Sequence, residues 1–333
     1  MQSEVPTLAH VARLADVSEN TVSRVIRNKG PIADKTRERV LSAIEQLGYV
    51  PNRAAGSLAS SSSLIIGVIL PSLSNIVFPE VLRGIHSALA ATPYQAMIGV
   101  SDYDLDQEEK ILTSLLAWHP AAVITTGFDH TETSRRLMRS NRIRVAELME
   151  IGDRPIDIAV GLSHRKAGTA TAHHLVSRGY RNIAYVGHDW TSDRRAHLRF
   201  EGLSQGLRDA GQAVVAVERF EGASSTMAGR ETLARLLAGG RKVDAVVFSN
   251  DDMAVGGYMH CLSQGLDMPG DLALFGFNGL DIGQALPKPL STIRSNRFLI
   301  GRTAVEKLLE SPEPPSEPQV IDTGFEIIEG ETA

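Results

Sequence analysis

The chain has 333 residues, of which 43% are apolar and 22% charged, and its net charge is −5 at pH 7. This length exceeds that of one compact domain and predicts two or three domains. No apolar run approaches the roughly 20 residues of a membrane span. The start, MQSEVPTLAH, lacks the basic and apolar segments of a secretion signal. We therefore expect a cytoplasmic protein with no membrane partner.

Charge is divided unevenly along the chain. Residues 1–62 carry eight Lys and Arg against six Asp and Glu, whereas the remainder carries 26 against 33. A weakly basic head on an acidic body is compatible with a small DNA-binding domain that makes few phosphate contacts.

The first 50 residues predict three short helices. Thr7 is the expected N-cap of the first helix, Asp16-Val17 forms a tight turn, and Ser18 is the expected N-cap of the second. A third helix over 34–47 ends at Gly48, a natural left-handed terminator. The apolar faces of the three helices comprise Leu8, Val11, Ala12 and Ala15, then Val22, Val25 and Ile26, then Val40, Leu41, Ile44 and Leu47. This is the helix-turn-helix arrangement, whose second helix enters the major groove.

The second helix carries side chains suited to reading bases. Asn20 can form two hydrogen bonds with adenine, Glu19 can accept from cytosine, and Arg24 can bind guanine or a phosphate. Hydroxyls suited to phosphate oxygens are supplied by Thr7, Thr21 and Ser23, and the N-cap Ser18 is also a candidate DNA-binding residue. The alternative is that Glu19 and Asn20 merely form a solvated first turn, where acidic residues are common.

The segments TLAHVARLADVSENTVSRVIRNKG and KTRERVLSAIEQLGYVPNRAAGSLAS closely resemble the head and hinge of LacI-family repressors. The resemblance implies that 52–60 is a hinge helix, which orders only on DNA and enters the minor groove. Asn52 and Arg53 would contact DNA there, and Leu58 would wedge between base pairs and kink the duplex. Its alternative is a plain interdomain linker. Ala33 departs from the family pattern, which usually has a capping Ser before the third helix.

From Leu64 onward, apolar runs alternate with amphipathic helices, which predicts parallel sheets covered on both faces. Helices are expected near 75–92 and 105–118. The predicted strands are 65–70, 96–100, 121–125 and 143–149, followed by a second series at 182–187, 213–217, 244–248 and 272–277. Two such series predict two doubly wound α/β subdomains with a cleft between them.

The resemblance implies that this core is similar to a periplasmic sugar-binding protein, with the chain crossing between its halves near 160–163, 290–293 and 321–324. The expected organisation is a head over 1–50, a hinge over 51–63 and a core over 64–333. Within the core, the N-subdomain covers about 64–161 and 293–321, and the C-subdomain about 162–291 and 322–333.

Polar residues that follow the strands are the candidate effector contacts, because ligands of parallel sheets bind beyond the strand C-termini. Arg194 belongs to this set by position. The resemblance implies effector contacts at Glu150, Arg199, Asn250 and Asn278. It implies a pocket lining at Ser72, Asn75, Val77, Phe78, Thr126, Arg195 and Ser224. Relatives often carry Asp at position 278 and a ring-stacking aromatic at position 224. Ser224 therefore argues against a flat purine or a stacked hexopyranose.

The arginines indicate the class of effector. Neutral sugars need at most one bidentate Arg, whereas a carboxylate or phosphate favours guanidinium groups in a desolvated cleft. Arg195 and Arg199 offer two such groups. One of them is alternatively a structural ion-pair partner of Glu150 or Asp193. PSLSNIVFPEVLRGI and NGLDIGQ resemble the gluconate branch of the family. The expected effector is a sugar acid, 2-ketogluconate first and gluconate second.

No motif indicates catalysis, a cofactor or a metal. The histidines lack metal-ligand spacing, and GxSxG, P-loop and GxGxxG patterns are absent. Cys261 is expected to be a buried small hydrophobe. The sequence thus predicts a homodimeric repressor of sugar-acid catabolism genes. It binds a pseudo-palindromic operator and is released by its effector. The alternatives are a regulator of another carbohydrate or purine pathway, a corepressor-type regulator, and a free-standing sugar receptor.

Overall fold

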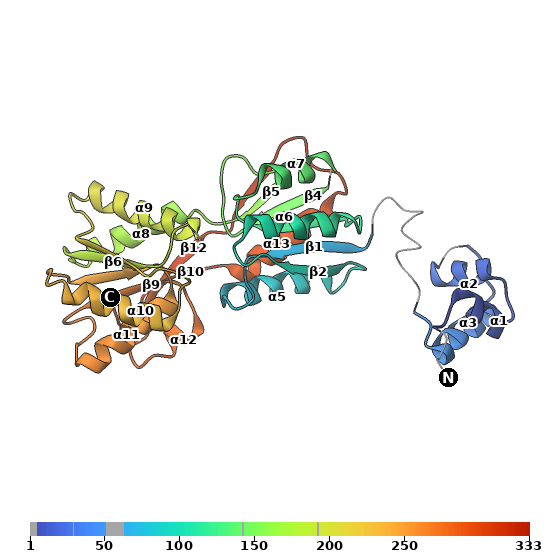
Figure 1. The fold of residues 1–333 in the computed structure, drawn as a ribbon, viewed down its shortest axis with the longest axis horizontal. Helices are drawn as coiled ribbons and strands as arrows, with labels where there is room; N and C mark the ends of the chain where they lie inside the picture. The colour runs from blue at the N-terminus through green and yellow to red at the C-terminus, as the bar shows by residue number, and fades with distance from the viewer. Residues whose placement is uncertain (1–4, 29, 51–62, 142, 192) are drawn as a thin grey trace. The chain divides into compact units, whose positions relative to one another are not determined.

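The computed structural model describes residues 5–28, 30–50, 63–141, 143–191 and 193–333. The chain forms two compact units, Met1–Ser63 and Leu64–Ala333 (Figure 1). None of the helices in this described part combines the length and apolarity needed to cross a membrane. The predicted hinge positions Asn52, Arg53 and Leu58 lie outside the described residues.

The N-terminal unit consists of three helices, α1 (Leu8–Leu14), α2 (Glu19–Ile26) and α3 (Asp34–Leu47). The Thr7 and Ser18 hydroxyls cap α1 and α2 as expected, and Gly48 ends α3 in the left-handed region at φ 62°. Ala33 gives α3 no side-chain cap. The core of this unit is Val11, Ala12, Ala15, Val22, Val25, Val40 and Ala43.

One predicted core residue of this unit is wrong. Leu41 is 52% exposed, whereas its neighbour Val40 is fully buried. The buried stripe of α3 runs through Val40 and Ala43, with Ile44 and Leu47 packed at its edge. Leu41 falls outside that stripe because one step along a helix turns the side chain by about 100°.

The first lobe of the core is a six-stranded parallel sheet in the order β11-β5-β4-β3-β1-β2. Its strands are β1 (Ile65–Leu70), β2 (Gln95–Val100), β3 (Ala122–Thr126), β4 (Arg144–Leu148), β5 (Ile158–Gly161) and β11 (Gln319–Asp322). Its helices are α5 (Val77–Leu89), α6 (Leu105–Leu116), α7 (Glu132–Ser140) and α13 (Arg297–Glu310). Figure 1 shows α13, near the red end of the colour scale, among the blue-green elements of this lobe.

The second lobe is a six-stranded sheet in the order β12-β10-β9-β8-β6-β7, in which only the β10–β12 pair is antiparallel. Its strands are β6 (Ile183–Gly187), β7 (Ala216–Arg219), β8 (Ala245–Phe248), β9 (Ala273–Asn278), β10 (Ser291–Ser295) and β12 (Phe325–Ile328). Its helices are α8 (His164–Ser177), α9 (Arg194–Asp209), α10 (Thr226–Ala238), α11 (Asp251–Gln264) and α12 (Asp281–Gln284). Both lobes are thus doubly wound α/β units.

The chain passes between the lobes three times, between β5 and α8, between β10 and α13, and between β11 and β12. The second passage differs from the prediction of 290–293. Residues 291–295 form β10 of the second lobe, so the passage lies at Asn296. The predicted second-lobe segment 322–333 also starts one residue early, because Asp322 still pairs with Gly161 in the first sheet.

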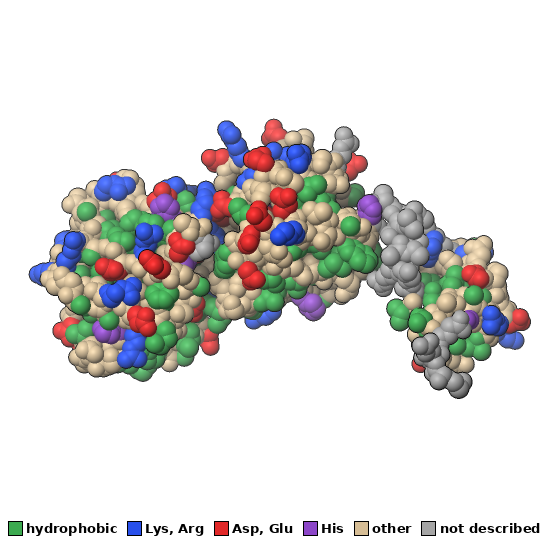
Figure 2. Space-filling view, viewed as in Figure 1, with side chains coloured by type: hydrophobic (Ala, Val, Ile, Leu, Met, Phe, Trp, Pro, Cys, Tyr) green, Lys and Arg blue, Asp and Glu red, His purple; other side chains and the backbone are tan. Residues whose placement is uncertain are grey.

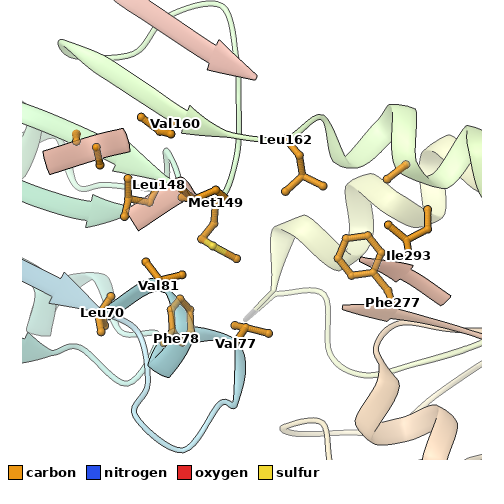
Figure 3. Close-up of a cluster of buried hydrophobic side chains, with 14 of the residues drawn as sticks. Leu70, Val77, Phe78, Val81, Leu148, Met149, Val160, Leu162, Phe277 and Ile293 are labelled. Carbon is orange, nitrogen blue, oxygen red and sulfur yellow. The ribbon is translucent and has the colours of Figure 1, made fainter. Parts of the chain in front are cut away.

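One apolar cluster runs through both lobes and across their junction. It joins first-lobe side chains such as Phe78 and Leu148 to second-lobe side chains such as Phe277 and Ile293. Figure 3 shows Met149 and Leu162 between these two groups, where the lobes meet. The lobes therefore share a continuous core beside the chain crossings.

Candidate functional sites

The first turn of α2 presents polar side chains away from the core of the N-terminal unit. Glu19 and Asn20 are exposed, whereas Val22 and Val25 on the opposite face are buried. Ser18 accepts from the Thr21 amide at 3.2 Å, and the two hydroxyls lie 2.9 Å apart. The hydroxyls of Ser18 and Thr21, both predicted DNA-binding residues, therefore also fix the start of the helix that carries Asn20.

Two further predicted DNA contacts are engaged within the protein. Exposed Arg24 donates to the Pro31 carbonyl at 3.3 Å, across the loop that leads to α3. Thr7 is exposed and forms a capping box with His10 at the start of α1. Ser23 is half-buried. Together with the exposed first turn of α2, these residues form a polar surface on the N-terminal unit.

In the core, a cavity of about 310 Å³ lies beyond the carboxyl ends of β1 to β4 and beside the start of α9. Four predicted effector residues line it, Thr126, Glu150, Arg194 and Arg195. Side chains that sequence reasoning did not select also line it, among them Ser101, Tyr103, Glu108, Asp129, His130, Arg135 and Asp193. Ser101 directly follows β2, and Tyr103, Asp129 and His130 lie in the loops just after β2 and β3, so the strand-end rule could have found these four.

Ion pairs between the lobes cross this cavity. The Arg194 guanidinium of the second lobe lies 2.6 Å from the Glu150 carboxylate of the first, and 3.9 Å from Asp129. Burial raises the pKa of Glu150, and Arg194 opposes that shift. Figure 2 shows acidic and basic side chains side by side where the lobes meet. Glu150 thus pairs with Arg194, whereas Arg195 pairs with Asp193, one of the two ion-pair partners that the sequence left open for it.

The Arg195 guanidinium is only partly paired within the described residues. Its Nε lies 3.5 Å from the Asp193 carboxylate, and its side chain is only 14% exposed. Among the described residues, no group hydrogen-bonds to its buried Nη1. Its guanidinium carbon lies 5.9 Å from the centre of the Phe78 ring. Arg195 is therefore a largely desolvated guanidinium at the cavity wall, and one of its nitrogens has no hydrogen-bond partner among the described residues.

In the loop after β1, Pro71 lines the cavity, whereas the predicted residues Ser72 and Asn75 support its wall. The amide nitrogen of the Asn75 side chain donates to the Tyr103 hydroxyl at 2.9 Å. Ser72 accepts from the Asn75 backbone amide, which fixes the turn. Val77 and Phe78 are buried in the apolar cluster. Burial raises the pKa of Tyr103, so its hydroxyl stays protonated as a hydrogen-bonding group.

A buried charged cluster lies beneath the cavity. His130 Nδ1 is 2.6 Å from Glu108, and its Nε2 is 3.4 Å from Glu147. Burial acts to lower the pKa of His130, but the two carboxylates outweigh it and raise that pKa to about 9. Its two carboxylate partners lie on α6 and β4, far from His130 in the sequence. The described residues contain no group of three His, Cys, Asp or Glu arranged to hold a metal.

Arg199 does not reach the cavity that Arg195 lines. It faces a pocket of about 20 Å³ among Tyr185, Ser249 and Phe277. Its Nη1 lies 3.2 Å from His164, and its Nη2 donates to the Ser249 carbonyl at 2.9 Å. Its guanidinium carbon lies 4.1 Å from the centre of the Phe277 ring. The two arginines predicted to grip one ligand therefore face different pockets.

Three other predicted contacts belong to neither pocket. Asn250 is buried and caps α11, accepting from the Met253 amide at 3.1 Å. Asn278 ends β9 at φ 125°, and its carbonyl accepts from Arg297. Ser224 is half-buried in the loop before α10. Their places follow from helix capping and strand ends, which position them at the same edge of the second sheet.

Comparison with known proteins decides the family. Residues 7–52 match the description "Bacterial regulatory proteins, lacI family", and residues 172–333 match "Periplasmic binding protein-like domain". The chain is 37% identical to the HTH-type transcriptional regulator GntR of Pseudomonas aeruginosa, over 98% of this chain and 95% of that protein. The chain belongs to the lacI family of bacterial regulatory proteins.

Solved LacI-family structures agree in fold. A family regulator from Silicibacter pomeroyi is 42% identical, with a TM-score of 0.92 over 98% of this chain and 99% of that one. The lac repressor dimer bound to operator and the anti-inducer ONPF is 26% identical, with a TM-score of 0.87 and 99% coverage of both chains. This LacI-family protein is thus a DNA-binding transcriptional repressor with a periplasmic-binding-protein-like core.

Proposed function

We propose that this repressor controls sugar-acid catabolism genes and that a sugar acid in the 310 Å³ cavity releases it from its operator. The observation that carries the proposal is Arg195, whose buried Nη1 has no protein partner among the described residues. A carboxylate is the partner that such a guanidinium prefers. A neutral sugar has no negative charge to pair with the Arg195 guanidinium.

The rest of the cavity suits a polyhydroxy chain. Glu150 and Asp129 offer acceptor oxygens for hydroxyl groups, and Thr126 and Tyr103 offer hydroxyls that donate or accept. The lining contains four acidic and four basic side chains, counting His130 as a cation. An uncharged flat ring would desolvate them without replacing their hydrogen bonds. Among sugar acids we place 2-ketogluconate first and gluconate second, as expected from the resemblance to the gluconate branch.

The proposed mechanism is a two-state coupling in a homodimer. Two heads bind a pseudo-palindromic operator, with the hinge segments in the central minor groove. The acid binds where the lobes meet, which changes the position of one lobe relative to the other and releases the hinge. Operator and effector then bind with negative, reciprocal coupling.

Calorimetric titration of the full chain tests the effector class. The ligands are 2-ketogluconate, gluconate, glucose, ribose and hypoxanthine. We expect the acids to bind and the neutral ligands not to. Replacing Arg195→Gln should weaken acid binding by roughly 10- to 100-fold, as expected for a charge-assisted hydrogen bond. Arg208→Gln, an exposed position on the same helix, is the matched control and should bind the acids normally. Preferential binding of hypoxanthine or glucose would refute the proposal.

Gel-shift titration tests the sign of the coupling. We expect saturating acid to weaken operator binding. Tighter operator binding in the presence of the acid would identify a corepressor and contradict induction.

A further inference from the structure

A single buried imidazole links the two lobes to Arg199. His164 is the first residue of α8 and is 3% exposed. Its Nε2 lies 2.8 Å from the carbonyl oxygen of Met149, at the end of β4 in the first lobe. Its Nδ1 lies 3.2 Å from Nη1 of Arg199 on α9. The imidazole therefore has one partner in each lobe.

The chemistry of the two partners fixes the state of the ring. A carbonyl oxygen only accepts, so Nε2 must carry the proton and donate to Met149. A guanidinium only donates, so Nδ1 must be unprotonated and accept from Arg199. Burial, Arg199 and Arg195 all lower the pKa of His164 well below its usual value. The neutral Nε2–H tautomer is the one form that satisfies both contacts.

The Met149 carbonyl lies where the second lobe contacts the end of β4. Met149 has a positive φ of 72°, which a side chain this bulky rarely adopts. The next residue, Glu150, is the cavity carboxylate that pairs with Arg194 of the second lobe. The end of β4 is thus held from the second lobe at two consecutive residues, one through His164 and one through Arg194. Figure 3 shows Met149 facing the junction, near Leu162 at the first crossing.

We propose that His164 is a positioning residue that couples the state of Arg199 to the end of β4, and so couples effector binding to lobe movement. This inference rests on the proposed function, because the coupled event is sugar-acid binding at the junction. The imidazole is rigid and its two nitrogens face different lobes. Asp193 lines the effector cavity and interacts electrostatically with both Arg195 and Arg199. An acid that pairs with Arg195 therefore changes the charges around Arg199, and a shift of the Arg199 guanidinium must move the ring or break one of its two hydrogen bonds. Either change alters how the second lobe holds Met149.

Two amide substitutions separate the two contacts. In His164→Asn the side-chain oxygen stands near Nδ1, so it can accept from Arg199 but does not reach Met149. In His164→Gln the longer amide places its nitrogen near Nε2, so it can donate to Met149 but leaves Arg199 without this acceptor. His173→Asn, at an exposed position on the same helix, is the matched control.

The experiment measures two quantities with 2-ketogluconate and gluconate for the full-length variants. They are the acid dissociation constant and the coupling factor, defined as operator affinity without acid divided by operator affinity at saturating acid. For His164→Asn we expect a dissociation constant within about threefold of the original and a coupling factor at least tenfold lower. For His164→Gln, which loses the contact with Arg199, we expect the same result, because loss of either contact uncouples Arg199 from Met149. The control should change neither quantity.

Two results would overturn the inference. In the first, both His164 variants match the control. In the second, both lose acid binding and coupling in parallel with a fall in melting temperature, which would indicate a purely structural role.

A measurement without ligand keeps this inference separate from the proposed effector. Nitrogen-15 NMR of histidine-labelled protein should show that the His164 ring is the neutral Nε2–H tautomer and that it stays neutral well below pH 6.5. The His164 signals are assigned by their loss in His164→Gln. If the original protein binds neither acid, the proposed effector class is wrong. The NMR result then tests by itself whether His164 bonds to both Met149 and Arg199. An Nδ1–H tautomer, or titration near pH 6.5, would refute this pair of bonds whatever the effector.

Discussion

The Thr323 hydroxyl donates to the Gly161 carbonyl at 2.9 Å, so the third crossing between the lobes is bonded to the first. The Asn296 side chain, in the second crossing, donates to the Thr323 carbonyl at 2.8 Å. The three chain crossings between the lobes are therefore joined to one another by hydrogen bonds. Movement of one lobe relative to the other must turn about this point or break these bonds.

Gly161→Ala should strain the backbone at the first crossing between the lobes. A Cβ there would lie 2.4 Å from the Glu150 amide nitrogen and 2.7 Å from the Met149 carbonyl carbon, which are backbone atoms that cannot rotate away. We expect the free energy of unfolding to fall by about 1–3 kcal/mol in urea titrations. Gly152→Ala is the control, because its Cβ meets only the Phe128 side chain, at 3.2 Å. Equal losses for the two variants would show that the close approach at Gly161 is unimportant.

His130 should make stability depend on pH above neutrality. Its pKa is about 9 in the folded protein and about 6.5 when unfolded. Between these values the folded state binds more protons, so the contribution is complete below pH 6.5 and is lost as pH rises through 9. The shift corresponds to roughly 3 kcal/mol. Unfolding free energies of the original protein and of His130→Gln, measured from pH 6 to 9.5, should therefore converge as pH rises.

The exposed His173→Gln variant is the control for this profile. It should follow the original protein at every pH. A gap between the original and His130→Gln that stays constant over the range would show that His130 does not titrate there.

The predicted strands agree with the structure where the sequence offers apolar runs. Residues 65–70 and 244–248 match β1 and β8 closely, since buried parallel strands need apolar side chains on both faces. β5, β10, β11 and β12 were missed. The last three contain polar residues, as in STIRS and QVID, and β11 and β12 lie at sheet edges. The strand predicted at 213–217 starts three residues too early, since β7 begins at Ala216. Like β12, β7 is an edge strand of the second sheet.

The candidate cavity was predictable only in part. Thr126 and Glu150 followed from the rule that ligands bind beyond strand ends, and both line it. The sequence could not separate Arg195 from Arg199, because four residues on α9 place both on one face of the helix. Their different pockets depend on how α8 packs against α9 and on where His164 stands. Those are tertiary contacts that no local pattern encodes.

Arg194→Gln should destabilise the core more than its exposure suggests. Arg194 is 46% exposed, but its partner Glu150 is only 6% exposed and would remain as a buried, unpaired carboxylate. We expect a loss of about 1–2 kcal/mol for Arg194→Gln, and a smaller loss when Glu150→Gln is added, because the double variant leaves no buried charge. Urea unfolding of Arg194→Gln, Glu150→Gln and the double variant measures both effects.

The comparison pair for this cycle is Arg302 with Glu306 on α13, where both side chains are about half exposed. Removing Arg302 should cost under about 0.5 kcal/mol. If the Arg194 and Glu150 losses are simply additive, the two side chains do not stabilise each other.

Asn20→Ala should change which DNA sequence is preferred rather than how stable the head is. Asn20 is exposed in the first turn of α2 and contributes nothing to the core of the N-terminal unit. Loss of its paired hydrogen bonds should reduce discrimination at one base pair by roughly 1–3 kcal/mol. Competition gel shifts with single-base operator variants, all at one salt concentration, measure this directly. Gln46→Ala, at an exposed position on α3, should leave the preference intact. A loss of affinity that is uniform over all operator variants would instead assign Asn20 to the phosphate backbone.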